Sequence, residues 1–227
     1  MDEKLAKIID ANIDNIPDWI ETINTYNSRF EKEELSEDNR VDLTYKIADV
    51  LSEISDLHFK YGNFKDKFDK TKMHLNVYGL NLIIKSEKLD CTFYWGIDSY
   101  EGLYIDTYMK EANNLRYMTD DFYKDLMSLS DLGDFTIGEN LGSSKEMEKK
   151  YNGLFNNQKS KIFNLLREYI IGIVENEKYI DLGSFRIKWN YETDFNELVQ
   201  NSCLAFKILY KMNYSLWKIS DLHRKKK

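Results

Sequence analysis

The chain has 227 residues, of which 31% are charged and 42% hydrophobic, and its formal net charge is −7. With 10 Gly, 1 Pro and 2 Cys, it lacks the composition of collagen-like, low-complexity and disulfide-stapled chains. Its 16 Tyr, 12 Phe and 4 Trp supply enough apolar surface to offset the entropy of folding, which excludes a disordered chain. We therefore expect a single α+β domain over residues 1–227, with residues 1–62 as a candidate helical subdomain.

Helical periodicity dominates the first sixty residues. Apolar residues at helical spacing predict one short helix before Pro17 and a second helix that begins at this proline. An acidic connection over residues 31–38 then leads to a third helix from about Asp42 to Tyr61, whose apolar residues trace one stripe. The N-terminal segment is therefore predicted to be helical.

The apolar period changes to two between residues 73 and 110, which is typical of β-strands. The clearest strand covers residues 89–98, where apolar and polar residues alternate without a break. Residues 103–110 alternate in the same way after a short connection that contains Gly102. The sequence therefore predicts a central, three-stranded antiparallel meander over about residues 73–110.

The register of the last hairpin follows from the same alternation. A shift of one residue would turn every side chain of one strand to the opposite face, so both apolar sets must stay on one face. The pairs predicted on this basis are Ile97 with Leu103, Trp95 with Ile105 and Tyr94 with Asp106. The connection then needs a five-residue loop or a bulge.

Long helices and one more strand are expected in the C-terminal part. A helix within residues 112–130 precedes a loop over residues 131–142. A capping box at Ser143 opens a helix that extends to about residue 174. Alternation predicts a strand over about residues 182–189, and a second capping box starts the last helix at Asp194.

The residues that most often carry metal or nucleophilic chemistry are scattered. The three His, at 58, 74 and 223, lack the short spacings of a zinc site. His58 lies beside the apolar stripe of the third helix, where a packed imidazole is expected. Cys91 and Cys203 follow apolar patterns, which predicts reduced, buried thiols of low reactivity. We therefore assign no catalytic residue, no metal ligand and no cofactor.

The polar face of the predicted hairpin is the candidate interaction surface. Tyrosine is enriched at the centres of protein interfaces because it buries area and keeps a hydroxyl group. If no helix covers this face, substitutions there are expected to cost within about 0.5 kcal/mol of stability, while Tyr104→Ala weakens partner binding. The predicted interaction residues are Tyr94, Asp98, Tyr104, Asp106 and Tyr108.

Charge is divided unevenly along the chain. Residues 1–141 contain 16 Lys+Arg against 29 Asp+Glu, a net charge of −13, whereas residues 142–227 carry a net charge of +6. The two halves attract each other within the fold, or both are solvated faces, or the acidic half meets a partner protein with a basic surface. Nucleic acid is expected to bind weakly, through the basic C-terminal residues that end in Arg224 to Lys227.

The interpretation that best fits these observations is a non-catalytic, acidic binding protein that acts by protein–protein contact. Its 26 Lys against 6 Arg and its 20 Asn are typical of AT-rich genomes, which suggests a low-GC bacterium or a phage. An inhibitor, immunity or accessory protein of a bacterial or phage defence or counter-defence system fits this composition. The alternatives are a divergent metal-dependent nuclease that uses Asp98 and Asp106, and a nucleic-acid-binding accessory protein that uses the basic half.

The location expected from the sequence is the cytoplasm. The N-terminus lacks a basic start followed by an apolar stretch, so no secretory signal is predicted. The most apolar segment, residues 162–174, is interrupted by Arg167 and Glu168 and is too short to cross a bilayer. No membrane association is therefore expected.

Overall fold

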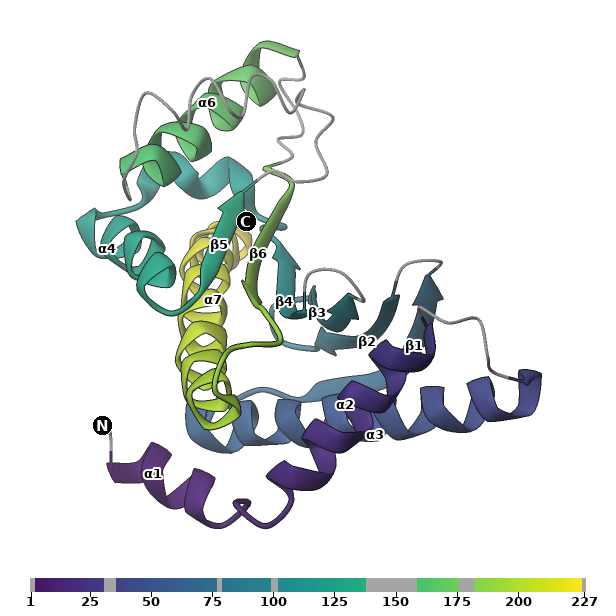
Figure 1. Cartoon of the computed structure of the whole chain (residues 1–227). Coiled ribbons are helices and arrows are strands. Elements are labelled where there is room, and N and C mark those ends of the chain that lie inside the picture. Colours follow the sequence, from purple (N-terminus) through teal and green to yellow (C-terminus); the bar gives the residue numbers. More distant parts are fainter. Residues whose placement is uncertain are drawn as a thin grey trace.

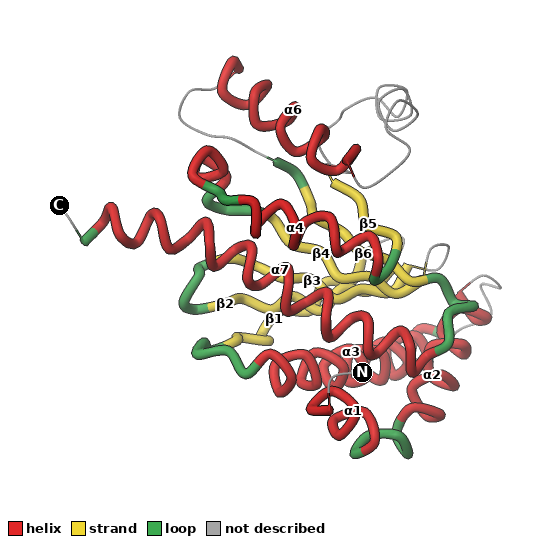
Figure 2. Tube along the Cα trace, turned by 90° about the vertical axis from the view of Figure 1, so that its left-hand side faces the viewer, coloured by secondary structure: helices red, strands yellow, loops and turns green. Residues whose placement is uncertain are grey.

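A six-stranded antiparallel sheet with helices on one face forms the centre of the computed structural model (Figures 1 and 2). The structure describes residues 3–30, 36–76, 79–98, 102–137, 159–175 and 182–225. The described helices are α1 (Glu3–Asp10), α2 (Ile16–Phe30), α3 (Glu37–Gly62), α4 (Asp120–Ser128), α6 (Lys159–Glu175) and α7 (Phe195–Arg224). Two short 3₁₀ helices, η1 (Ala112–Tyr117) and η2 (Leu129–Asp131), flank α4.

The strands follow the order β1-β2-β3-β4-β6-β5 across the sheet. Their bounds are β1 (Phe68–Asn76), β2 (Gly79–Ser86), β3 (Cys91–Asp98), β4 (Gly102–Tyr108), β5 (Asp134–Ile137) and β6 (Ser184–Trp189). The α+β class, the helical N-terminal segment and the late strand are as predicted. The meander has four strands rather than three, because Gly79 starts a separate strand instead of interrupting one.

The predicted register of the β3–β4 hairpin is confirmed. Trp95 lies opposite Ile105, and Tyr94 lies opposite Asp106. The ladder continues for one more pair, Asp98 with Gly102, while the connection itself lies outside the described residues. The alternation of apolar side chains therefore sets which face of the sheet carries the core.

That core lies between the sheet and two long helices. α3 packs on β2 and β3, α7 packs on β4, and the two helices contact each other (Figure 2). α1 and α2 then pack on the outside of α3 and α7. None of the helices among the described residues has both the length and the apolar character needed to cross a bilayer. The opposite face of the sheet carries the polar half of each alternating strand.

The region around β5 differs most from the predicted organisation. Residues 134–137 were expected to be loop but form β5, which pairs with β6. The strand escapes sequence analysis because four residues give too short a period to recognise. α6 packs against β5 and α4 (Figure 1). The predicted start of this helix, from Ser143 to residue 158, lies outside the described residues.

Candidate functional site

Four members of the predicted interaction set come together on the face of the sheet that points away from α3 and α7. Tyr94 and Tyr108 meet edge to face, with ring centroids 6.0 Å apart. Asp106 is paired with Tyr94 across the β3–β4 ladder. Asp98 ends β3, but its side chain lies outside the described residues.

This face is not the open, acidic surface that the sequence suggested. Tyr104 is only 6% exposed and Asp106 only 3% exposed, although Tyr108 keeps 39% of its surface. The expectation that Tyr104 and Asp106 are exposed is therefore wrong, and substitutions there are expected to cost more than about 0.5 kcal/mol of stability. Both side chains are covered by a residue from the neighbouring strand.

That residue is Arg186 of β6, which stands directly opposite Asp106 of β4. Its Nε and Nη2 donate hydrogen bonds of 3.2 and 2.8 Å to Oδ2 of Asp106. Its guanidinium carbon also lies 4.4 Å from the centroid of the Tyr104 ring. The negative charge of Asp106 is thus neutralised within the sheet. A cation beside this carboxylate opposes the binding of a metal ion there, which weakens the nuclease alternative.

Gly96 makes room for this arrangement. It pairs with Tyr104, whose ring crosses the β3 backbone at the glycine. A Cβ atom at Gly96 would lie 2.2 Å from Cζ of Tyr104, which no real contact allows. The hydroxyl group of Tyr104 donates a hydrogen bond to Oδ1 of Asn81 on β2. Residues from four strands therefore fix Tyr104 and Arg186 in place.

Ion pairs link part of the acidic half to the basic half. Four carboxylates between residues 106 and 134 contact cations of the basic half, which supports an attraction between the two halves within the fold. The pairs that join them are Asp106–Arg186 at 2.8 Å, Glu111–Arg224 at 3.7 Å, Asp125–Lys211 at 2.8 Å and Asp134–Lys188 at 4.0 Å. Arg186 and Lys188, two cations of the basic half, are thus engaged by carboxylates of the same chain.

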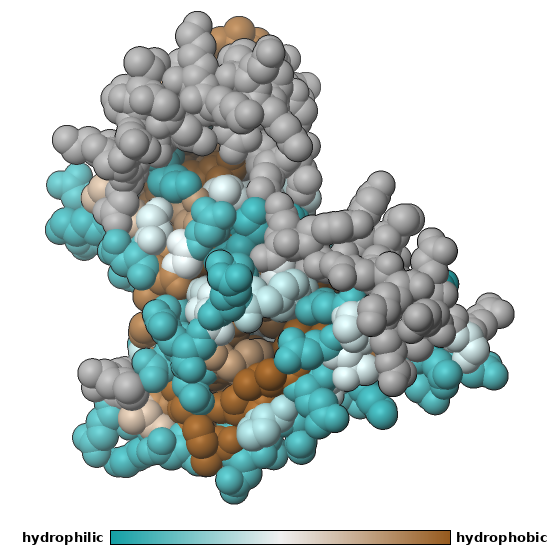
Figure 3. Space-filling model, viewed as in Figure 1, coloured by the Kyte–Doolittle hydropathy of each residue, from teal (hydrophilic) through white to brown (hydrophobic). Residues whose placement is uncertain are grey.

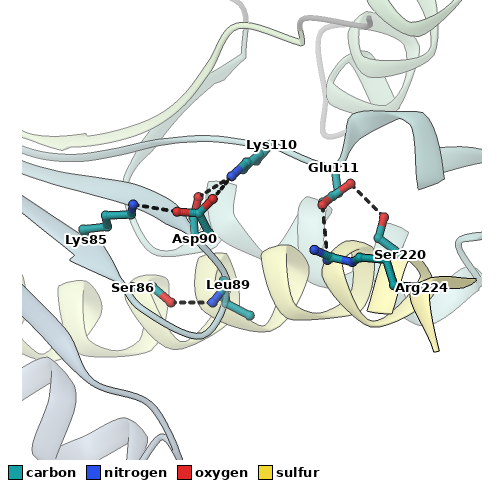
Figure 4. A network of polar contacts seen from close by, with 8 residues as sticks. All are labelled: Lys85, Ser86, Leu89, Asp90, Lys110, Glu111, Ser220 and Arg224. Atoms are coloured by element: carbon teal, nitrogen blue, oxygen red, sulfur yellow. Dashed lines mark hydrogen bonds and ion pairs between the residues drawn. The ribbon is translucent and has the colours of Figure 1, made fainter. Parts of the chain in front are cut away.

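Other carboxylates form local bridges between elements (Figure 4). Asp90, in the β2–β3 turn, lies between Lys85 and Lys110, and their hydrogen bonds lower its pKa to about 2. Glu111 accepts a hydrogen bond of 2.7 Å from Ser220 and contacts Arg224, both on α7. These carboxylates already contact cations of the same chain. They are therefore less available to a partner than carboxylates that form no ion pair.

Unpaired carboxylates gather instead on α2 and α3. Asp18 and Glu21 of α2 and Asp42 of α3 are exposed and line a groove of about 510 Å³ between the two helices. None of the three forms an ion pair with a described residue, and Lys46 is the one cation among the described residues that line the groove. Thr22, Thr25, Asn39 and Leu43 complete its walls. The groove offers a negatively charged, hydrogen-bonding surface that the sequence analysis did not locate.

The packed-histidine prediction is confirmed for His58. The side chain is fully buried, and burial lowers its pKa to about 3. Burial also raises the pKa of the thiols of Cys91 and Cys203 to about 12, so both are protonated at neutral pH and poor nucleophiles. In the part of the chain that the structure describes, no three His, Cys, Asp or Glu side chains gather as a metal site would require.

Comparison with known proteins finds no matching family model, no matching curated protein and no matching solved structure.

The residues that sequence reasoning missed are Arg186 as the partner of Asp106, and the α2–α3 groove. The alternation of β6 already placed Arg186 on the polar face of its strand. Its pairing with Asp106 depends on β6 lying next to β4, across 80 positions of sequence. The sequence shows that residues 18, 21 and 42 belong to the acidic half. It does not show that these three side chains line the same groove.

Proposed function

We propose that the chain is a non-catalytic binding protein that acts by contact with a partner protein carrying a basic surface. The observation that carries this proposal is the α2–α3 groove, where Asp18, Glu21 and Asp42 face solvent without an ion pair to any described residue. Carboxylates nearer the C-terminal half are largely matched by Lys and Arg of the same chain. The groove thus brings three carboxylates without an ion pair to any described residue onto one concave surface.

A basic protein fits this groove better than a nucleic acid does. Carboxylates repel phosphate, and the released counterions that drive nucleic-acid binding require Lys or Arg on the protein side. Lys and Arg side chains of a partner would instead meet complementary charge, which raises association rates and disfavours wrong partners. The threonine and asparagine side chains that line the groove supply hydrogen-bonding groups for the same partner.

The narrower role that we propose is that of an inhibitor, immunity or accessory protein in a bacterial or phage defence or counter-defence system. Such a protein acts by occupying a functional surface of its partner, and needs no catalytic group of its own. The composition supports this role, since Lys and Asn usage is typical of AT-rich genomes. Tyr94 and Tyr108, which lie on the sheet away from the groove, remain a proposed second contact.

The test is affinity capture from a lysate of the organism that makes the protein, with and without phage infection. The chain is compared with a groove variant, Asp18→Asn/Glu21→Gln/Asp42→Asn. A matched control, Glu87→Gln/Asp120→Asn/Asp121→Asn, removes three exposed carboxylates outside the groove and changes the net charge equally.

We expect a basic protein to be retained by the chain and the control variant, to be lost from the groove variant, and to elute as salt is raised. Equal retention by the groove and control variants would show that the groove is not the contact. Retention of nuclease-sensitive nucleic acid by the chain would favour the nucleic-acid alternative instead.

A further inference from the structure

The loop between β6 and α7 separates two hollows on the surface. On one side is a polar cleft of about 570 Å³, bounded by η2, the start of β5 and the first turns of α7. On the other side is a smaller hollow of about 110 Å³ between this loop, α2 and the start of β4. Trp189, Asn190 and Thr193 line both. A ligand that crosses the loop would therefore contact both hollows.

The smaller hollow is apolar at its floor and polar at its rim. Ile23, Leu103, Trp189 and Leu198 are each at most 5% exposed and form the floor. Exposed rim residues include Asn24 and Tyr191, the latter with 38% of its surface accessible. Figure 3 shows apolar surface gathered between α2 and the N-terminal part of α7, where Ile20 and Phe195 also line the hollow.

The volume of this hollow matches one side chain rather than a whole ligand. An apolar cavity of about 150 Å³ holds one benzene molecule, so a hollow of about 110 Å³ accommodates one aliphatic side chain. An apolar pocket surrounded by a polar rim is the usual setting of an energetically dominant contact in a protein interface. The hollow is therefore suited to anchor a single apolar residue of a partner.

The walls of the hollow are fixed before anything binds. The indole N–H of Trp189 donates a hydrogen bond of 2.7 Å to the carbonyl oxygen of Leu132. Oδ1 of Asn190 accepts hydrogen bonds from the backbone N–H of Glu192 at 3.1 Å and from the hydroxyl group of Thr193 at 3.0 Å. Binding would thus cost little ordering entropy in the loop.

Carboxylates lie in the cleft and in the loop beside the hollow, whose lining comes from both halves of the chain. Within the described part of the chain, the one cation that lines the adjoining cleft is Lys188, which faces Asp134 at 4.0 Å. On the far side of α2 lies the α2–α3 groove. The carboxylates of the cleft and the loop are Asp131, Asp134, Glu192, Asp194 and Glu197.

We propose that the hollow receives one apolar side chain of a partner polypeptide segment whose flanking residues are Lys or Arg. This inference rests on the proposed function, and it specifies the partner as a basic segment with an apolar anchor. The anchor lies on the floor formed by Leu103 and Trp189, and the flanking cations lie against the carboxylates of the cleft and the loop.

The test selects binders from a display library of random short peptides on the immobilised, full-length chain. Selected peptides are then synthesised, and their affinities are measured for three proteins: the chain, Asn24→Leu and Asn24→Ala. Asn24 lines the hollow from the exposed side of α2. Leucine at this position fills the hollow, whereas alanine leaves it open, and both residues favour a helix.

We expect the selected peptides to share one aliphatic residue flanked by Lys or Arg. Asn24→Leu should weaken their binding at least about tenfold, and Asn24→Ala should change it less than about twofold. Replacing the aliphatic residue of the peptide by serine should reproduce the loss seen with Asn24→Leu.

Other outcomes separate this inference from the proposed function. Basic peptides that bind Asn24→Leu normally and fail to bind the Asp18→Asn/Glu21→Gln/Asp42→Asn variant would overturn the apolar anchor and support the groove. Selected peptides without Lys or Arg would overturn the basic flanks of this inference, whereas the basic partner of the groove is judged by the lysate experiment. A selection that enriches no peptide would overturn the inference alone, because the lysate experiment judges the groove independently.

Discussion

The indole N–H of Trp95 on β3 donates a hydrogen bond of 2.9 Å to Nδ1 of His58 on α3. Since a tryptophan can only donate, Nδ1 carries no proton, and the proton of the neutral ring is on Nε2. Nε2 lies 2.9 Å from Oγ of Ser202, whose own proton is directed to the carbonyl oxygen of Val199. One imidazole thus joins the sheet, α3 and α7, and its tautomer follows from its partners.

This arrangement predicts a specific dependence of stability on pH. The pKa of His58 is lowered from 6.5 to about 3, so the unfolded chain takes up a proton that the folded chain refuses. Its contribution to stability is complete above pH 6.5 and is lost as the pH falls toward 3, by up to about 1.4 kcal/mol per pH unit. The free energy of unfolding, measured with urea between pH 3 and pH 6.5, should depend less steeply on pH for His58→Gln than for the unmodified chain.

The control for this measurement is His223→Gln, because His223 is exposed near the end of α7. Its profile should match that of the unmodified chain. Parallel profiles for the chain and His58→Gln would contradict the assignment of the pH dependence to His58.

Thiol reactivity is expected to report unfolding. Cys91 and Cys203 are both free and buried, and burial raises their pKa to about 12. The thiolate, which is the reactive form, is therefore scarce in the native protein. A colorimetric thiol reagent at neutral pH should label neither residue rapidly without denaturant and should count two thiols per chain in denaturant. Rapid native labelling of either residue would show that its surroundings open readily.

The alternation of side chains was enough to predict the β3–β4 register. A one-residue slip would have moved Trp95 and Ile105 from the core to the other face, so only one register buries both. The same pattern could not predict that Tyr104 and Asp106 are buried. Their cover is Arg186, and its position depends on β6 docking beside β4 from far along the chain. Local periodicity carries no information on such strand order.

The candidate site was likewise predictable from the sequence only in part. Tyr94, Asp106 and Tyr108 share one face of the hairpin as predicted, because the strand period alone determines which side chains lie on the same face. Which carboxylates remain unpaired depends on distances between elements. Asp125 meets Lys211 of α7, whereas Asp42 faces a groove that only the packing of α2 on α3 creates. Net charge along the sequence could not separate these two kinds of acidic residue.

Gly96 and Tyr104 are expected to be energetically coupled. A Cβ atom at position 96 would displace the Tyr104 ring, so Gly96→Ala should destabilise the fold by about 1–3 kcal/mol. Tyr104→Ala should cost about 2 kcal/mol or more, because the ring is buried. The double variant should cost clearly less than the sum, since the clash disappears with the ring. Additive costs in denaturant unfolding would contradict the contact.

Two further substitutions provide reference values for the cost of changing Tyr104. Tyr104→Phe keeps the ring, removes the hydroxyl group that donates a hydrogen bond to Asn81, and should cost about 1 kcal/mol. Trp95→Ala on the helix-covered face should cost about 3–5 kcal/mol, because the indole is fully buried and supports His58.

The pair formed by Asp106 and Arg186 is expected to be costly to break from one side. Arg186→Gln leaves a carboxylate with only 5% of its side chain exposed, and the loss of one partner of a buried pair costs about 3 kcal/mol or more. The side chain of Arg186 is 20% exposed, so solvent screening places the expected cost at the lower end of that range. Asp106→Asn should show a similar cost, since it removes the negative charge that accepts two hydrogen bonds from the guanidinium group.

The double variant Asp106→Asn/Arg186→Gln distinguishes a structural pair from two independent effects. With both charges removed, neither desolvated ion remains, so its free energy of unfolding should exceed that expected from adding the single losses. Lys211→Gln is the control, because the side chains of Lys211 and Asp125 are 58% and 21% exposed and their ion pair should contribute at most about 1 kcal/mol. If Arg186→Gln cost no more than Lys211→Gln, Asp106 would have to be stabilised by other groups. The cover that Arg186 provides for this face would then contribute little to the fold.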